Sequence, residues 1–542
     1  MAQGAVSLGK GGNVDRDAPG NGQMSGSSYI EGDMKTFVRF SLYSLTVLAL
    51  VFSATGAAAA PGKHVLRSGN TFTVVPTGVD DTVNLQNAFN LALAAFPLSS
   101  LQEGTRSRPI SPEITSRTNL PLGAELSISA SLGRGNTGRF PLVVDLFIQQ
   151  AKLLATDGAA WNMFGISAAL SADGNTALVV MSNRRSSKVW SAYIFVRSGT
   201  TWSQEAKLLA SDGAVGESFG ASVALSSDGN TALVGSDDSA YAFVRSRTTW
   251  SQQAQLLGAD GAAVGASVAL SADGNTALLG APGDTVGGNS GQGSAYIFIR
   301  SGTTWSQQAK LLASDGAVGE RFGASVALSA DGNTALVGAY ATFPGTQGSV
   351  YALVRSGTTW SQQAKLLASD GAVQDQFGCS LALSDDGNTA LVGAYKIIIG
   401  SNTDQGAAYA FVRSGTTWSQ QAKVLASDGA AGDYFGLSVS LSADGNIALV
   451  GAPDDTADSN TMQGSAYFFV RSGTTWSQQA KLLASDGAAW DQFGYASAMS
   501  ADGHTALVGA YYDTVGGNEG QGSAYIFHLW QPTIFLPMVM RN

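Results

Sequence analysis

The side chains of this sequence that could do chemistry are mainly carboxylates. Forty Asp and Glu residues outnumber thirty Lys and Arg residues, which gives a net charge of −10. Several converging carboxylates can hold a hard cation such as Ca²⁺, and a specialised pair can hydrolyse glycosides. The most distinctive acidic residues lie in segments of variable length, and we predict that they bind a ligand: Asp284, Asp454, Asp455, Asp458 and Asp513.

Residues for other kinds of catalysis are scarce. The histidines are His64, His504 and His528, and the single cysteine is Cys379, which we interpret as a small buried side chain. No Ser-His-Asp arrangement and no metal-type spacing of His or Cys is present. No carboxylate pair stands out either, so we predict no catalytic residue, no metal site and no enzymatic activity. The acidic balance argues against a nucleic-acid partner, which needs basic patches.

The elements that must position the acidic residues belong to a repeat. An Ala-Lys-Leu-Leu segment or a variant of it begins at seven places: Ala151, Ala206, Ala254, Ala309, Ala364, Ala422 and Ala480. Such regular self-similarity is the signature of a repeat architecture.

The fourth copy shows the layout of one unit. Apolar stretches predict strands over 323–329, 333–339, 349–355 and 359–367, with a tight Asp-Gly-Asn turn after the first. Four antiparallel strands in a unit of this length are typical of a propeller blade. The sequence therefore predicts an all-β fold, a seven-bladed β-propeller of four-stranded antiparallel blades over 147–530.

The two ends of the repeat array predict how the ring closes. The last unit ends near His528 without a fourth strand, whereas Phe147 to Leu154 forms a fourth strand with no unit before it. We predict that this N-terminal strand completes the final blade.

Tryptophans recur at the start of the fourth strand in six units. A ring of tryptophans could stack on sugars, but we favour packing between blades as their role. They are Trp202, Trp250, Trp305, Trp360, Trp418 and Trp476.

The segments outside the repeat suggest export. Basic residues, an apolar run and small residues over 34–60 are typical of a signal peptide, with an uncleaved membrane anchor as the alternative. We expect a protein secreted or held at the cell surface, with no membrane span after cleavage. The remaining segments are interpreted as a doubtful N-terminal extension (1–33), a fragment resembling the start of a parallel β-helix (61–105), a linker (106–146) and a C-terminal tail (531–542).

The repeat resembles the FG-GAP family, whose repeats form the integrin α-chain propeller and many bacterial surface proteins. The resemblance rests on pairs such as Phe322-Gly323 and on Gly280-Ala281-Pro282 and Gly451-Ala452-Pro453. It implies Ca²⁺ in the hairpins between first and second strands. These hairpins carry one Asp each, or two in Asp385-Asp386, so we predict no cofactor and keep Ca²⁺ as an alternative.

The variable loops point to recognition. In a propeller, the loops between blades and those between second and third strands share one face, and variable loops on a rigid scaffold commonly bind ligands. We predict a monomeric extracellular binding, adhesion or scaffold module for a protein or glycan. The alternatives are a carbohydrate-active or other hydrolytic propeller enzyme, and a structural component of the cell envelope.

Overall fold

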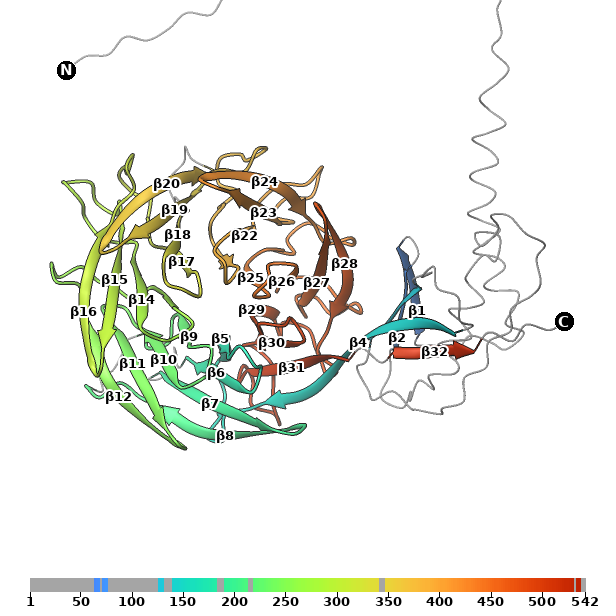
Figure 1. Cartoon of the computed structure of the whole chain (residues 1–542). Helices are drawn as coiled ribbons and strands as arrows, with labels where there is room; N and C mark the ends of the chain where they lie inside the picture. Colours follow the sequence, from blue (N-terminus) through green and yellow to red (C-terminus); the bar gives the residue numbers. More distant parts are fainter. Residues whose placement is uncertain are drawn as a thin grey trace, which may run out of the picture. The chain divides into compact units, whose positions relative to one another are not determined.

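The computed structural model describes the chain over 63–68, 71–76, 125–130, 139–182, 190–212, 218–340, 347–530 and 533–537, and side chains within 147–529. Every regular element in those ranges is a β-strand. Seven four-stranded antiparallel blades follow one another around a ring (Figure 1). Six blades are separate sheets, and the seventh belongs to an eight-stranded sheet that also contains strands from the flanking regions. The prediction of an all-β, seven-bladed propeller is confirmed.

The first three blades run from Phe164 to Leu311. Blade 1 contains β5 (Phe164–Leu170), β6 (Thr176–Met181), β7 (Ser191–Ser198) and β8 (Thr201–Leu208). Blade 2 contains β9 (Val223–Leu225), β10 (Thr231–Gly235), β11 (Ala240–Ser246) and β12 (Thr249–Leu256). Blade 3 contains β13 (Ser267–Leu270), β14 (Thr276–Ala281), β15 (Ser294–Ser301) and β16 (Thr304–Leu311).

The remaining blades repeat the same order. Blade 4 contains β17 (Ser325–Leu328), β18 (Thr334–Ala339), β19 (Ser349–Ser356) and β20 (Thr359–Leu366). Blade 5 contains β21 (Leu381–Leu383), β22 (Thr389–Ala394), β23 (Ala407–Ser414) and β24 (Thr417–Val424). Blade 6 contains β25 (Ser438–Leu441), β26 (Ile447–Ala452), β27 (Ser465–Ser472) and β28 (Thr475–Leu482). Blade 7 contains β29 (Phe493–Met499), β30 (Thr505–Ala510), β31 (Ser523–Trp530) and the second half of β4 (Arg139–Leu153).

Each blade is buried on both faces because its neighbours stack against it. The second strand of blade 4, β18, is buried along its whole length, whereas the fourth strand, β20, alternates between exposed and partly buried residues. Phe322 is fully buried, and its ring packs edge-on at 5.3 Å from Tyr351 of the third strand. Gly323 follows at a φ of 93°, and a Cβ there would lie 2.3 Å from the Ser294 carbonyl oxygen of blade 3. This Phe-Gly pair, which blade 3 replaces with Val264-Gly265, therefore fixes the entry into a blade by packing and by close backbone contact.

The hairpins between first and second strands use their aspartates as turn residues. In blade 4, Ser329 Oγ donates to Asp331 at 2.6 Å, and the backbone N–H and side-chain amide of Asn333 donate to the two oxygens of that carboxylate at 2.9 Å. Neighbouring hairpins are joined by backbone hydrogen bonds that run from each hairpin to the next around the ring. The last of them, from Ala501 N to Ala172 O at 2.9 Å, joins blade 7 to blade 1.

The ring closes through a strand from the N-terminal side. Leu146 to Leu153 of β4 pair with β31, with Ile148 opposite His528. Phe147 is 2% exposed and its ring centroid lies 4.3 Å from that of Phe468 in blade 6. The predicted closure by this strand is confirmed.

The tryptophans join neighbouring blades, as favoured from the sequence. In blade 4, Trp360 Nε1 donates to Gln308 Oε1 of blade 3 at 3.3 Å. Gln308 sits at a β-bulge of the fourth strand, where the pairing register shifts. The first glutamine of the Trp-Ser-Gln-Gln motif also bridges blades, since Gln362 Oε1 accepts from Ser314 N at 3.0 Å. The polar fourth strand is therefore a line of contacts between blades as well as a solvated rim.

The regions flanking the ring contain further strands. β1 (Lys63–Ser68) and β2 (Thr71–Pro76) form an antiparallel hairpin, and β3 (Glu125–Ala130) pairs with both β2 and β4. The predicted linker, 106–146, thus includes β3 and the first half of β4. β32 (Thr533–Pro537), in the predicted C-terminal tail, pairs with Arg139–Val143 of β4. The predicted extension and signal segment over 1–60 lie outside the described residues, and within the described ranges no helix is long and apolar enough to cross a membrane.

Candidate ligand-binding face

The loops between blades and the loops between second and third strands meet on one face of the ring, which we call the variable-loop face. Backbone bridges join the two kinds of loop at neighbouring blades, for example Gly293 to Phe322 and Gly464 to Phe493. The five predicted ligand-binding aspartates lie in loops of this face.

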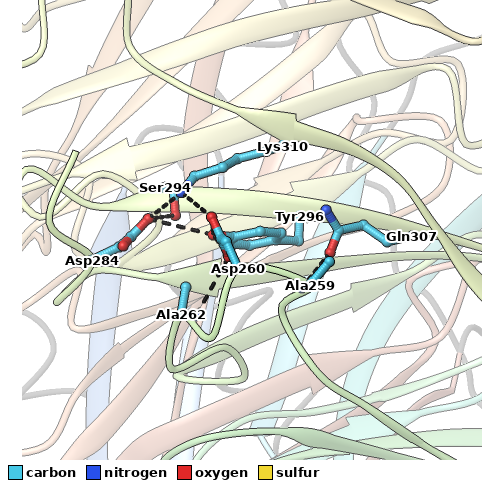
Figure 2. A network of polar contacts seen from close by, with 8 residues as sticks. All are labelled: Ala259, Asp260, Ala262, Asp284, Ser294, Tyr296, Gln307 and Lys310. Carbon is cyan, nitrogen blue, oxygen red and sulfur yellow. Dashed lines mark hydrogen bonds and ion pairs between the residues drawn. The ribbon is translucent and has the colours of Figure 1, made fainter. Parts of the chain in front are cut away.

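A Tyr-Asp-Lys network recurs beneath this face. In blade 3, Tyr296 of the third strand donates to Asp260 at 2.8 Å, and Lys310 of the fourth strand pairs with the same carboxylate at 2.6 Å (Figure 2). Lys310 lowers the pKa of Asp260 to about 2, because it donates a hydrogen bond to the ionised form. The aspartate of the Asp-Gly pair after a fourth strand therefore links the third and fourth strands of the next blade.

Asp284, Asp455 and Asp513 occupy equivalent positions and join this network as second carboxylates. Asp284 accepts from Ser294 Oγ at 2.6 Å and pairs with Lys310 at 2.7 Å, as Figure 2 shows. Asp455 and Asp513 repeat these contacts and are only 4% and 3% exposed. These three predicted ligand-binding residues thus hold their loops against the third and fourth strands.

Blade 5 provides an internal comparison for this arrangement. Ile397 stands at the position of the second carboxylate, and Ala407 stands at the position of its serine partner. Ile397 is 3% exposed and packs in the apolar cluster of blades 4 and 5. Ile397 and Ala407 therefore replace the Asp and Ser of blades 3, 6 and 7 together. This is expected because a buried polar side chain left without its hydrogen-bond partner is destabilising.

A third carboxylate enters the network in blades 6 and 7. Asp433 and Asp491 are 4% and 3% exposed, and each accepts a hydrogen bond from a backbone N–H of its own loop. Burial, together with the nearby Asp455 or Asp513, raises the pKa of each to about 6. Blade 1 carries Asn162 at this position, where its Oδ1 accepts the corresponding bond from Ala159 N.

Asp454 and Asp458 lie apart from the Tyr-Asp-Lys network. Asp454 accepts a hydrogen bond from Gln492 Nε2 at 2.6 Å. Burial is the main cause of the raised pKa of Tyr434, and the charge of Asp454 also contributes to it. Asp458 is exposed and adopts a φ of 49° in the loop turn. The structure therefore places Asp454 among polar and aromatic side chains and Asp458 at the solvent-exposed edge of its loop.

Aromatic side chains around Asp454 form a cluster to which the blades contribute unequally. The ring centroids of Tyr395 and Tyr434 lie 5.4 Å apart, and those of Tyr495 and Tyr511 lie 4.3 Å apart. Contacts continue through Tyr512 to Trp161 at the start of blade 1. We call this set the aromatic cluster: Trp161, Tyr395, Tyr434, Tyr495, Tyr511 and Tyr512.

Sequence reasoning missed both the Tyr-Asp-Lys network and the aromatic cluster. The co-occurrence of Asp and Ser ten residues apart in three units, against Ile397 and Ala407 in blade 5, is a signal that could have revealed the network. Tyr395 and Tyr511 occupy the same repeat position after Gly-Ala, but this position does not show which other aromatic rings lie beside them. In the part of the chain that the structure describes, no group of three or more His, Cys, Asp or Glu side chains is arranged to hold a metal ion.

Comparison with known proteins agrees with the repeat. A family model described as FG-GAP repeat matches six segments that together exceed half of the chain: 202–243, 250–298, 305–353, 360–411, 418–469 and 476–527. Each match starts in the fourth strand of one blade and ends in the third strand of the next. A search of the curated proteins found no match.

Proposed function

Because the chain belongs to the FG-GAP repeat family, we propose that it is a binding or scaffold module that recognises a protein or glycan on its variable-loop face outside the cell. We propose no enzymatic activity. Among the described residues, the carboxylates that lie close together, such as Asp260 and Asp284, share a lysine and a tyrosine as hydrogen-bond donors. Extracellular placement rests on the signal-like segment over 34–60.

The observation that carries this proposal is the aromatic cluster. Its side chains are partly exposed, and tyrosine and tryptophan combine a large apolar area with a polar group, which is why they are enriched in binding sites. Trp490, in the loop that leads into blade 7, adds a side chain that is 61% exposed. Asp454 and Asp458 add carboxylates from the loop between β26 and β27, whereas Asp284, Asp455 and Asp513 support the loops from below.

The proposal is tested by probing arrays of glycans and of cell-surface proteins with the full-length chain. For a ligand found in this way, the double variant Tyr511→Ala, Tyr512→Ala should lower affinity at least tenfold, because buried aromatic contacts dominate binding energy. The matched control is Leu257→Ala, which changes a side chain 55% exposed in blade 2 and should leave affinity unchanged. Equal loss in both variants, or no loss in either, would contradict recognition by the aromatic cluster.

A further inference from the structure

Three blades show how the fold holds a carboxylate. The donors are a serine at the start of the third strand, a tyrosine two residues later and the lysine of the fourth strand, which together we call the donor triad. In blade 3, Ser294, Tyr296 and Lys310 lie 2.6, 3.4 and 2.7 Å from Asp284 Oδ2 (Figure 2). Blades 6 and 7 repeat the arrangement around their own aspartates.

Blade 4 has the donor triad without the carboxylate. Its members are Ser349, Tyr351 and Lys365, and the sequence from 340 to 346 contains no acidic residue that could take the place of Asp284. A cavity of about 300 Å³ lies beside these donors, and its lining includes Ser349 and Lys365. The remaining carboxylate partner of Tyr351 and Lys365 is Asp315, at 2.8 and 2.6 Å.

The amide of Gln347 is a second difference between blade 4 and blade 3. In blade 3, Gln292 Oε1 accepts from Asn289 Nδ2 at 2.9 Å. The equivalent Gln347 of blade 4 lines the cavity, and its buried Oε1 has no hydrogen-bond partner among the described residues. Pro344 stands in the sequence where blade 3 has Asn289, so this amide lacks the partner that its counterpart uses.

Two other blades without the second aspartate place an apolar or thioether side chain near the corresponding donor positions. In blade 5, Ile397 packs there and the serine is Ala407. In blade 1, the Met181 thioether lies 3.5 Å from the Tyr193 hydroxyl, whereas blade 4 has the smaller Ala339 at the position of Met181. Blade 4 therefore has neither the aspartate of blades 3, 6 and 7 nor the Met181 or Ile397 side chain of blades 1 and 5.

We propose that the donor triad of blade 4 binds the carboxylate of an Asp or Glu side chain from a partner protein. The inference deepens the proposed function and rests on it for the choice of the variable-loop face. An aspartate side chain is the group that the same donors hold in blades 3, 6 and 7. The cavity lies at the lower end of the range for small-molecule pockets, about 300 to 1,000 Å³, which suits one inserted side chain better than an oligosaccharide.

The surrounding charge is compatible with this ligand. Glu320 lines the cavity, and its carboxylate accepts from Ala317 N at 3.1 Å. Blade 6 has Asp433 at the corresponding position and still holds Asp455 beside a single lysine, Lys481. Blade 6 therefore shows that the fold accommodates three carboxylates around one lysine. In blade 4, Glu320 weakens the binding of a carboxylate ligand because the two negative charges repel each other.

The test is titration of the full-length chain with N-acetyl-aspartate methylamide, followed by NMR, beside the uncharged N-acetyl-asparagine methylamide. We expect a dissociation constant in the millimolar range, on the order of −4 kcal/mol, and binding at least tenfold weaker for the asparagine compound. Ser349→Ala and Lys365→Gln should each lower affinity about tenfold. Glu320→Gln keeps the acceptor for Ala317 N and should raise affinity several-fold.

Two variants serve as controls for the location of the site. Lys423→Gln changes the equivalent lysine of blade 5, where Ile397 fills the space, and should leave the titration unchanged. Replacing 340–346 with the blade 3 loop sequence 282–291 supplies an internal aspartate and should abolish binding. Equal binding of the two compounds, or undiminished binding in the loop variant, would overturn the proposal. Free glucuronic acid binding more tightly than the aspartate compound would also overturn it, because a sugar acid would then be the preferred ligand.

The outcome is separable from that of the proposed function. A ligand on the arrays together with no titration by the aspartate compound refutes the pocket alone. Titration of the pocket without any ligand on the arrays refutes recognition by the aromatic cluster and leaves the pocket standing.

Discussion

Replacing Asp491 with asparagine should stabilise the propeller at neutral pH. This carboxyl group is 3% exposed, and burial and the neighbouring Asp513 raise its pKa to about 6 from an ordinary value of 3.8. A raised pKa in the folded state means that folding favours the protonated form, so the ionised group opposes folding above about pH 6. Asparagine keeps an oxygen to accept from Ala488 N, as Asn162 does for Ala159 N in blade 1.

The size of the effect follows from the pKa. A shift of about two units corresponds to ~3 kcal/mol at a pH above both values. Part of this is offset because asparagine forms a weaker hydrogen bond than a carboxylate, so we expect a gain of ~1–3 kcal/mol at pH 7. The gain should shrink as the pH falls through 6, and little of it should be left near pH 4, where the wild-type carboxyl is protonated in the folded protein.

The assay is the midpoint of thermal or urea unfolding of wild type and variant between pH 4 and pH 8. Asp375→Asn is the matched control, because burial also raises the pKa of Asp375 but Ile397 stands where blades 6 and 7 have the second carboxylate. Its gain should be smaller. A destabilised Asp491→Asn variant at pH 7, or a gain that does not depend on pH, would refute the reasoning.

The closure, the network and the thiol give further predictions. Phe147→Ala should cost about 3–5 kcal/mol in the free energy of unfolding measured in urea, because the ring packs on Phe468 at the closure; an unchanged midpoint would contradict that role. Asp455→Ile should destabilise the protein, and adding Ser465→Ala should restore about 1–2 kcal/mol in a double-mutant cycle, since blade 5 carries this apolar pair; additive losses would show that the two side chains are independent. Burial raises the pKa of the Cys379 thiol to about 11, so alkylation of the folded protein at pH 8 should be about a hundredfold slower than that of an ordinary cysteine, with the urea-unfolded chain as control and equal rates as the contrary result.

The sequence alone predicted most of the propeller. The spacing of seven copies, the Asp-Gly-Asn turns and the unpaired strand at Phe147 were enough to predict the blade, the number of blades and the closure. These features are local or periodic, so they can be read along the chain. The tryptophans were correctly assigned to packing, because a side chain that recurs in six units points to the contact between units.

The candidate site was predicted only in outline. Asp284, Asp455 and Asp513 were recognised as special, but their burial against serine, tyrosine and lysine was not. Asp454 lies near Tyr434, from the loop that enters its own blade, and near Tyr511 of blade 7. A pattern within one repeat does not show which side chain a neighbouring blade brings close.

The sequence by itself thus determined the repeating unit and the order in which the units close, because turns and strand periodicity depend on neighbouring residues. Only the tertiary structure decided which carboxylates are available to a ligand. Where a donor triad surrounds the aspartate, the aspartate holds its loop in place. In blade 4 that aspartate is missing, and an open cavity lies beside the donor triad. Whether a carboxylate is available to a ligand depends on the space around it, and residues from three different parts of the chain define that space.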